Sequence, residues 1–265
     1  MEPPGTAPGS DPLITSAFMS IVPKDIPDIG KPTVRRKGVV DCTGCRAAYD
    51  ARIMCNLYSL TSAQSAITDL VGLWRDETGN LPAMTGIYPD YPAPVIINAP
   101  EGRKMQMMRW GMPSPAFVLK GRKTDKGVTN VRNTASPHWR RWLGPAHRCL
   151  VPFTGFSEYQ AVKGGKPKAV WFAPTGTQKT LFFAGIWTEW TSVRKLAEGE
   201  TTNTLFAFLT VEPNGVVGPI HPKAMPVILR SPEALTHWLD APVDAALKLQ
   251  RPFPDDGLKI VDGPF

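Results

Sequence analysis

After residue 54 the chain consists of short apolar runs separated by polar turns. The clearest runs are residues 95–98, 105–110, 148–152, 169–172, 181–187, 205–211 and 227–229. Runs of this length, rich in β-branched and aromatic residues and bounded by Gly, Pro and Asn, predict β-strands. Strands do not alternate with long helical segments, so the sheet is expected to be mainly antiparallel. The pattern predicts an α+β fold, with a barrel-like β-sheet and short peripheral helices.

Three segments carry signals of these helices. The first places four apolar residues at i, i+3, i+4 and i+7 behind Thr61, the expected N-cap: Ile67, Leu70, Val71 and Trp74. Ser136-Pro137 and Ser231-Pro232 each combine a capping residue with proline at the first helical position. A short helix is therefore expected behind each proline.

The first 53 residues lack the strand pattern. They hold seven prolines and a single Cys-x-x-Cys motif, Cys42 to Cys45. A zinc site needs a second pair of ligands at suitable spacing, so we expect no metal there. Residues 1–53 are expected to be a disordered extension, or to precede the true start of translation. Residues 54–265 are expected to form a single catalytic domain.

Composition and charge limit the class of protein. No run approaches the ~18 apolar residues of a membrane span, so no membrane association is expected. Four cysteines in 265 residues do not make a disulfide framework, which favours a reducing, cytoplasmic location. The net charge is +7, and the last 212 residues hold 23 Lys and Arg against 17 Asp and Glu. This excess indicates either a nucleic-acid partner or ordinary surface charge. We expect a monomer without a cofactor.

Five polar or reactive residues stand at strand ends or tight turns: Cys55, Asn130, Arg132, Glu158 and His221. Each has a simple structural interpretation. Cys55 can be a small buried residue at a strand start, and Asn130 can begin a turn. Arg132 can pair with a surface carboxylate, Glu158 can lie on the solvent face of a strand, and His221 can be a loop residue.

Trp110 also has two interpretations. It precedes Gly111 and a proline-containing segment at the end of the apolar run 105–110. Its ring either fills the core or is exposed and available to a nucleobase.

Taken together, these residues resemble the SRAP family (SOS response-associated peptidase, the abasic-site-processing proteins). The resemblance covers about residues 54–230 and rests on blocks in the same order: Met54-Cys55, 88–96, Trp110-Gly111, 130–132, 148–159, 183–187 and His221 ahead of 225–229. It implies the SRAP-like fold and a role in the DNA damage (SOS) response. The implied activity is covalent capture of abasic sites in single-stranded DNA.

The resemblance assigns the chemistry to an N-terminal cysteine. Loss of Met54 would leave Cys55 with an α-amine and a thiol, which titrate near ~8 and ~8.5 in peptides. The amine would condense with the sugar aldehyde, and the thiol of the same residue would close a thiazolidine ring. Glu158 would transfer the proton that opens the sugar, and His221 would act as acid or base on the imine or its reversal. Asn130 would hold the amine and the sugar.

The resemblance also implies DNA contacts. Arg132 would clamp a phosphate, Trp110 would stack on or wedge beside a base, and Lys223 would neutralise another phosphate. The family commonly has Gly-Arg after the cysteine, where this chain has Asn56-Leu57. Lys223 replaces a family arginine in a segment one residue longer, and lysine cannot bind phosphate in a bidentate manner. Phosphate contacts are therefore expected to be weaker or differently placed.

The position of Cys55 leaves several alternatives open. A cysteine inside a chain has no α-amine, so either translation starts at Met54, which we prefer, or the chain cleaves itself before Cys55. Associated autopeptidase or lyase activity is compatible with both. A thiol peptidase that uses Cys55 and His221 on other proteins is the alternative enzyme. A non-catalytic basic DNA-binding module is the third possibility.

Overall fold

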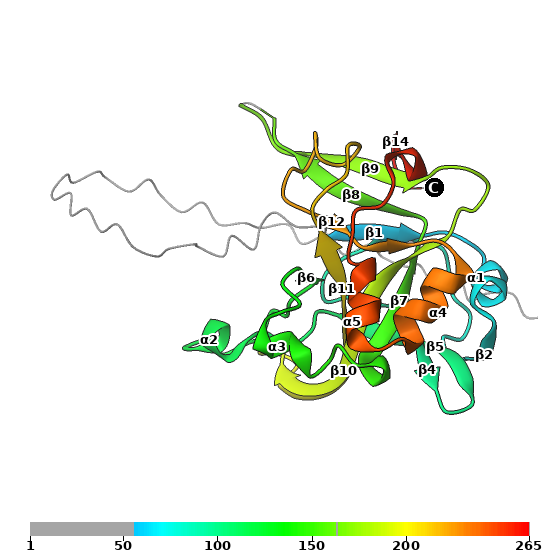
Figure 1. Ribbon diagram of the computed structural model, residues 1–265. Coiled ribbons are helices and arrows are strands. Elements are labelled where there is room, and N and C mark those ends of the chain that lie inside the picture. Colours follow the sequence, from blue (N-terminus) through cyan, green and yellow to red (C-terminus); the bar gives the residue numbers. More distant parts are fainter. Residues whose placement is uncertain (1–55, 163, 265) are drawn as a thin grey trace, which may run out of the picture. The chain divides into compact units, whose positions relative to one another are not determined.

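Two β-sheets carry the fold of this protein (Figure 1). The computed structural model describes residues 56–162 and 164–264, which all belong to one compact unit within Tyr49–Phe265. The smaller sheet has the order β14 (Leu258–Val261), β9 (Lys168–Pro174), β8 (Gly155–Gln160), β1 (Leu57–Leu60) and β3 (Met84–Ile87). Each strand in it is antiparallel to its neighbours. Cys55 and the segment 1–53 lie outside the described residues.

The larger sheet contains the long strands. Its order is β12 (Met225–Pro226), β11 (Glu200–Val211), β10 (Leu181–Val193), β7 (Arg148–Phe153), β4 (Pro92–Ala99), β5 (Gly102–Trp110) and β2 (Leu73–Asp76). Two short strands complete it: β13 (Ile228–Leu229) on β10 and β6 (Asn130–Val131) on β11. Parallel pairing occurs between β2 and β5, β11 and β5, and β11 and β6. The predicted mainly antiparallel sheet is confirmed.

The helices are short and lie at the periphery of the sheets (Figure 1). They are α1 (Gln64–Val71), α2 (Ala116–Leu119), α3 (Pro137–Arg140), α4 (Pro232–Asp240) and α5 (Val243–Ala246), with 3-10 turns at Pro145–His147, Leu247–Leu249 and Asp255–Gly257. None of the helices in the described part of the chain combines the length and apolar character needed to cross a membrane. The predicted α+β class with peripheral short helices is confirmed.

Helix α1 differs from the prediction at both ends. Ala63, not Thr61, is its N-cap, and Thr61 instead contacts the Thr154 hydroxyl through its backbone N–H and its side chain. Gly72 ends the helix in the left-handed conformation (φ 60°), which glycine adopts without steric cost. The chain then enters β2, and Trp74 is half exposed instead of lying on the buried face of the helix.

The other two helices start where the serine–proline pairs predict. Pro137 lies in the first turn of α3 and Pro232 in the first turn of α4. The Ser231 hydroxyl accepts a hydrogen bond from the Ala234 N–H (3.2 Å), as an N-cap does. Ser136 makes no side-chain capping bond. The sequence signal therefore located both helix starts, although only one of the two serines caps through its side chain.

Aromatic rings form the centre of the hydrophobic core. Tyr58 on β1 makes edge-on contacts with Trp110 (5.2 Å), Phe183 (5.7 Å) and Phe208 (6.2 Å), measured between ring centroids. Phe183 also stacks on Phe153 at 3.9 Å. Edge-to-face and offset rings pack well because the ring edge is positive and the ring face is negative. These contacts join β1 of the smaller sheet to β5, β10 and β11 of the larger one.

Candidate active site

A buried carboxyl–imidazole pair lies at the start of strand β1. Glu158 on β8 and His221, in the segment before β12, are each only 2% exposed. The Nδ1 atom of His221 is 2.7 Å from Oε2 of Glu158. The backbone N–H of His221 donates to the Val217 carbonyl (2.8 Å), which fixes this turn. Two titratable groups at this distance and burial form a strong hydrogen bond that orients the imidazole ring.

The orientation of His221 leaves its second nitrogen inside the site. Because Nδ1 is engaged with Glu158, the ring can exchange a proton with another group only through Nε2. This atom is buried and has no hydrogen-bond partner among residues 56–162 and 164–264. Buried polar atoms in proteins are normally paired, and exceptions are frequent at functional sites. The pair therefore has the geometry of a general acid or base.

The β1–β8 register places this pair next to the residue that follows Cys55. Leu57 is paired with Ser157 and Tyr58 with Phe156 in antiparallel fashion. Continuing this register by one residue sets Asn56 opposite Glu158. Directly opposed residues in an antiparallel pair have their side chains on the same face. The carboxylate thus faces the first described residue of the chain.

A second set of polar contacts reaches Asn56 from strand β6. Asn130 is buried, and its Nδ2 donates to the Thr129 hydroxyl at 2.9 Å. The Thr129 hydroxyl donates to Oδ1 of Asn56 at 3.2 Å. Since β6 pairs with β11 in parallel at Phe208, Asn130 is held on the larger sheet. The site is therefore built from β1, β6, β8 and the segment that contains His221.

Trp110 supports this site from inside the core. The ring is completely buried and lies 5.2 Å from both Tyr58 and Phe208, measured between centroids. Its Nε1 donates to the Thr129 carbonyl (3.0 Å). The expectation that Trp110 stacks on a nucleobase is therefore wrong, because neither face of the ring is accessible. The alternative, a core residue, is what the structure contains.

The two expected phosphate ligands, Arg132 and Lys223, lie side by side at the surface. The Arg132 side chain is 43% exposed, and one of its guanidinium nitrogens donates to the Lys223 carbonyl at 3.2 Å. Another lies 3.4 Å from Oε2 of Glu212, which is 64% exposed. Lys223 is also exposed. Arg132 therefore has the surface carboxylate partner that its structural interpretation predicted, and it remains reachable by an anion.

Sequence reasoning missed Asn56 and Thr129 as members of the site. Each is a direct neighbour of a candidate residue, since Asn56 follows Cys55 and Thr129 precedes Asn130. Their mutual hydrogen bond joins strand starts far apart in sequence, which no local pattern reveals. No group of three or more potential metal ligands occurs in the part of the chain that the structure describes.

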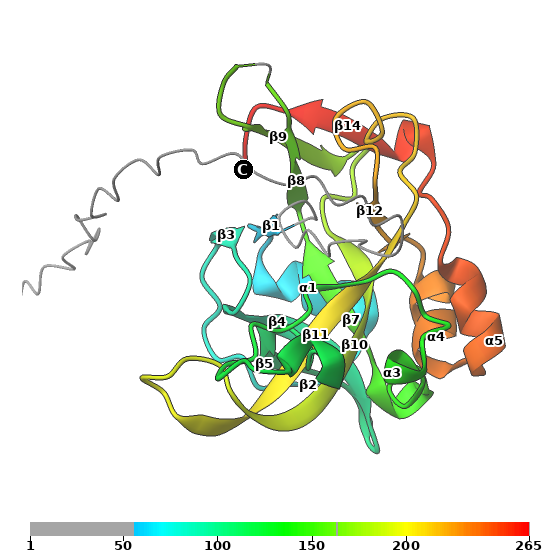
Figure 2. The same ribbon diagram turned by 90° about the vertical axis from the view of Figure 1, so that its left-hand side faces the viewer.

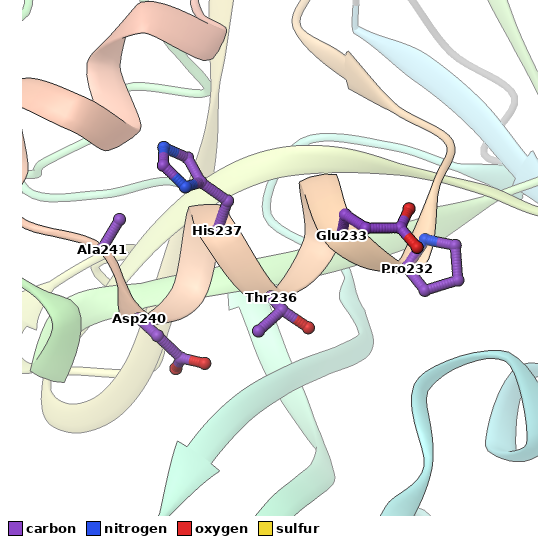
Figure 3. Close-up of a pocket in the computed structure, with 6 residues that line it drawn as sticks. All are labelled: Pro232, Glu233, Thr236, His237, Asp240 and Ala241. Carbon is purple, nitrogen blue, oxygen red and sulfur yellow. The ribbon is translucent and has the colours of Figure 1, made fainter.

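A separate hollow runs along helix α4 (Figure 3). It is lined by Pro232, Glu233, Thr236, His237, Asp240 and Ala241. None of these residues belongs to the Glu158–His221 site, and their side chains fan out along one helix. The polar pair beside β1, not this hollow, is the candidate centre of the chemistry.

The fold and the site define a strand-rich protein with a buried acid–base pair at the start of its first described strand. This chain belongs to the SOS response associated peptidase (SRAP) family, whose model matches residues 54–262. A curated relative is the abasic site processing protein HMCES of Pongo abelii. It is 25% identical over 245 residues, which cover 79% of this chain and 68% of that protein.

Solved structures share the fold. A protein from Bacteroides thetaiotaomicron has a TM-score of 0.61 and 20% identity, over 78% of this chain and 90% of that one. A Bordetella bronchiseptica protein has a TM-score of 0.59 and 24% identity, over 78% and 98%. A phage-related protein of the same organism has a TM-score of 0.57 and 21% identity, over 78% and 93%. These similarities extend over nearly the whole of each solved chain.

Proposed function

We propose that this protein processes abasic sites in single-stranded DNA by bonding to them through Cys55, as part of the DNA damage response. The observation that carries the proposal is the buried Glu158–His221 pair beside Asn56, the residue bonded to Cys55. Family membership and the name of the Pongo abelii relative support the substrate class. The match to the family begins at Met54, one residue before the cysteine.

The proposed reaction needs one aldehyde and the two nucleophiles of one residue. The abasic sugar opens to an aldehyde, and the α-amine of Cys55 adds to its carbon. Loss of water then gives an imine. The thiol adds to the imine carbon while its proton moves to the nitrogen, which closes a five-membered thiazolidine. The second attack is intramolecular and benefits from a high effective concentration.

Proton transfers in this sequence fall to the buried pair. Glu158 would take the proton of the sugar hydroxyl as the ring opens, because its carboxylate faces the start of β1. His221 would exchange protons with the departing water or the imine nitrogen through Nε2. Their mutual hydrogen bond of 2.7 Å lets a proton gained by one partner be stabilised by the other.

Asn130 would position the nucleophilic residue. Its hydrogen bonds pass through Thr129 to Asn56, so the backbone next to Cys55 is held from β6 as well as from β8. Reaction rates depend strongly on such positioning, since small displacements of reacting atoms are costly. Loss of this chain of hydrogen bonds should lower the rate of bonding while leaving DNA affinity nearly unchanged.

Arg132 and Lys223 would bind the phosphates beside the lesion. Both are exposed, and they lie together because Arg132 donates to the Lys223 carbonyl. Each phosphate contact adds a salt-dependent part to the affinity. The protein would act as a monomer on a single strand, in the cytoplasm.

The amine of Cys55 must be free for this chemistry. The protein would begin at Met54 and lose it, or would cleave itself before Cys55 by attack of the thiol on the preceding carbonyl. The intact mass of natively expressed protein separates these cases from a longer mature chain. Self-cleavage further requires that Cys55→Ala retains the leader.

Denaturing gel electrophoresis with abasic single-stranded DNA tests the function. Without a reductant, wild-type protein should form an adduct that survives denaturation, and Cys55→Ala, which lacks the thiol, should form none. Cys55→Ser is the matched control: a chain that begins with the substituted residue keeps the α-amine and a side chain of similar size, so its imine should be trapped by borohydride but should not persist without it. Equal adducts from wild type and Cys55→Ala would overturn the proposal. Cleavage of an unrelated protein without an adduct would favour a thiol peptidase instead.

A further inference from the structure

A short turn carrying two tyrosines lies on the other side of strand β1. Residues 88–91 join β3 to β4, and β3 lies beside β1 (Figure 2), with Tyr58 paired to Ile87. A Cβ atom added to Gly86 would lie 3.2 Å from Tyr88 Cε2 and 3.6 Å from Leu57 Cδ1. The Tyr88 ring therefore converges over Gly86 with the side chain of Leu57, which follows Cys55 by two residues.

The two tyrosine rings form one exposed aromatic surface. Tyr88 is 45% exposed and Tyr91 is 53% exposed. Their ring centroids are 5.6 Å apart and the ring planes are inclined by 62°. Single exposed rings are common, but two in contact beside a candidate catalytic site offer a continuous surface for another aromatic group.

The turn that holds these rings is firmly anchored. Asp90 between them adopts a left-handed conformation (φ 72°), which is uncommon for a residue other than glycine. The Asp90 N–H donates to the Trp110 carbonyl at 2.8 Å, and the Trp110 N–H donates to the Tyr91 carbonyl at 3.0 Å. The Tyr91 N–H closes the turn on the Tyr88 carbonyl at 3.1 Å. The rings thus lose little freedom when a ligand binds.

The anchor is an ion-pair cluster with one more cation than carboxylates. The Asp90 carboxylate contacts Arg109 at 2.7 Å, the buried Arg194 at 3.1 Å and Lys195 at 3.3 Å. Glu198 pairs with Arg109 and Lys195, so the cluster holds three cations and two carboxylates. Burial works to raise the pKa of Asp90, but the hydrogen bond and charge of Arg109 and the charge of Arg194 hold that pKa at about 2. The Asp90 carboxylate therefore stays ionised at neutral pH, and its ion pairs keep the turn anchored.

We propose that Tyr88 and Tyr91 form a stacking platform for the unpaired bases that flank the abasic nucleotide. Bases stack on aromatic side chains largely irrespective of sequence, and the exposed Lys195, which contacts Asp90 in the same turn, can reach an attached phosphate. The platform lies on the side of β1 away from β8 and meets Leu57, whose side chain points to the face opposite that of Asn56. The DNA that flanks the lesion would therefore cross the start of β1 on its way from the acid–base pair to the tyrosines. The inference rests on the proposed function for the identity of the ligand.

Fluorescence anisotropy with undamaged labelled single-stranded DNA tests the platform without requiring any covalent reaction. Replacing both tyrosines by leucine should weaken binding about tenfold, while replacing both by phenylalanine should leave it unchanged. Trp74→Leu is the matched control, since Trp74 is 51% exposed on β2. It lies beside the other end of β5, about 20 Å from Trp110 along the strand. Thermal melting of all three variants checks that each of them is folded.

A second oligonucleotide, with tetrahydrofuran in place of the bases, identifies what the tyrosines contact. Wild type and the leucine variant should bind this DNA equally, because no base remains to stack. Equal binding of the two proteins to normal DNA, or an equal loss on both DNAs, would overturn the platform. Absence of an adduct from wild-type protein on abasic DNA would instead overturn the proposed function, and the anisotropy comparison would still decide the platform.

Discussion

Glu158→Gln tests whether the buried pair transfers protons. Glutamine keeps the size of the side chain and can still accept a hydrogen bond from Nδ1 of His221, 2.7 Å away in the wild type. It cannot carry a proton or a negative charge. The substitution therefore separates orientation of the imidazole from acid–base chemistry.

The expected loss in rate follows from the role of the pair. General acid–base groups typically contribute about 10²- to 10⁴-fold to a rate. Because the substituted amide would still orient His221, we expect the lower part of this range, about 10²-fold slower adduct formation. A charged hydrogen bond contributes about 1.5–3 kcal/mol to stability. Since the amide retains a neutral hydrogen bond, the free energy of unfolding should fall by about 1–2 kcal/mol.

The assay is single-turnover adduct formation on saturating abasic DNA, resolved on a denaturing gel. Glu101→Gln, at an exposed turn, is the matched control and should react like wild type. Affinity for the DNA before reaction should be unchanged in both variants. A Glu158→Gln rate within twofold of wild type would refute the reasoning, because the pair would then have no proton to transfer.

Four further substitutions test contacts elsewhere in the structure. Arg132→Ala should weaken binding to single-stranded DNA and lower the slope of log affinity against log salt by about 0.7, whereas Glu212→Gln should strengthen binding slightly by freeing the guanidinium, both measured by anisotropy. Arg148→Met should destabilise the fold by about 3 kcal/mol in urea unfolding, because the buried guanidinium donates to three carbonyls that would lose their donor. Asp90→Asn should lower stability by about 1 kcal/mol at pH 7. Since the pKa of Asp90 is depressed to about 2, this difference should persist above pH 4 and vanish as the pH falls through 2, as followed by thermal melting. An unchanged salt dependence for Arg132→Ala would contradict its phosphate contact. An unchanged urea midpoint for Arg148→Met, or a stability difference for Asp90→Asn that does not depend on pH, would contradict the contacts of those two residues.

The local parts of the fold were predictable from the sequence. Strands β4 and β5 and their turn at Glu101-Gly102 follow from two apolar runs joined by a glycine-containing turn. The outer half of the β10–β11 hairpin, which extends away from the body of the sheet in Figure 2, could not be predicted from the sequence. Its pairs from Thr188 to Val193 are rich in threonine, serine and charge, so no apolar run marks these residues as strand. Backbone pairing with a well-formed inner hairpin extends strands beyond the apolar run.

The wrong interpretation of Trp110 and the unpredicted contact between Glu158 and His221 have a common physical cause. The sequence shows which residues are aromatic or charged, but it does not show which neighbours enclose them in the folded protein. Trp110 is buried by Tyr58 and Phe208, which come from two other strands. Glu158 and His221 lie 63 residues apart and meet only because β8 and the segment before β12 come together. The resemblance to a family named both residues, but their contact required the structure.

In the proposed reaction, Cys55 supplies both its sulfur and its α-amine nitrogen to the sugar carbon. The most direct test of this reaction is tandem mass spectrometry of the proteolysed adduct between the mature protein and an abasic oligonucleotide. We expect a DNA-bearing peptide that begins with Cys55, with a mass equal to peptide plus DNA minus one water. A DNA-bearing peptide that retains any residue before Cys55, or that carries the DNA on another side chain, would contradict it.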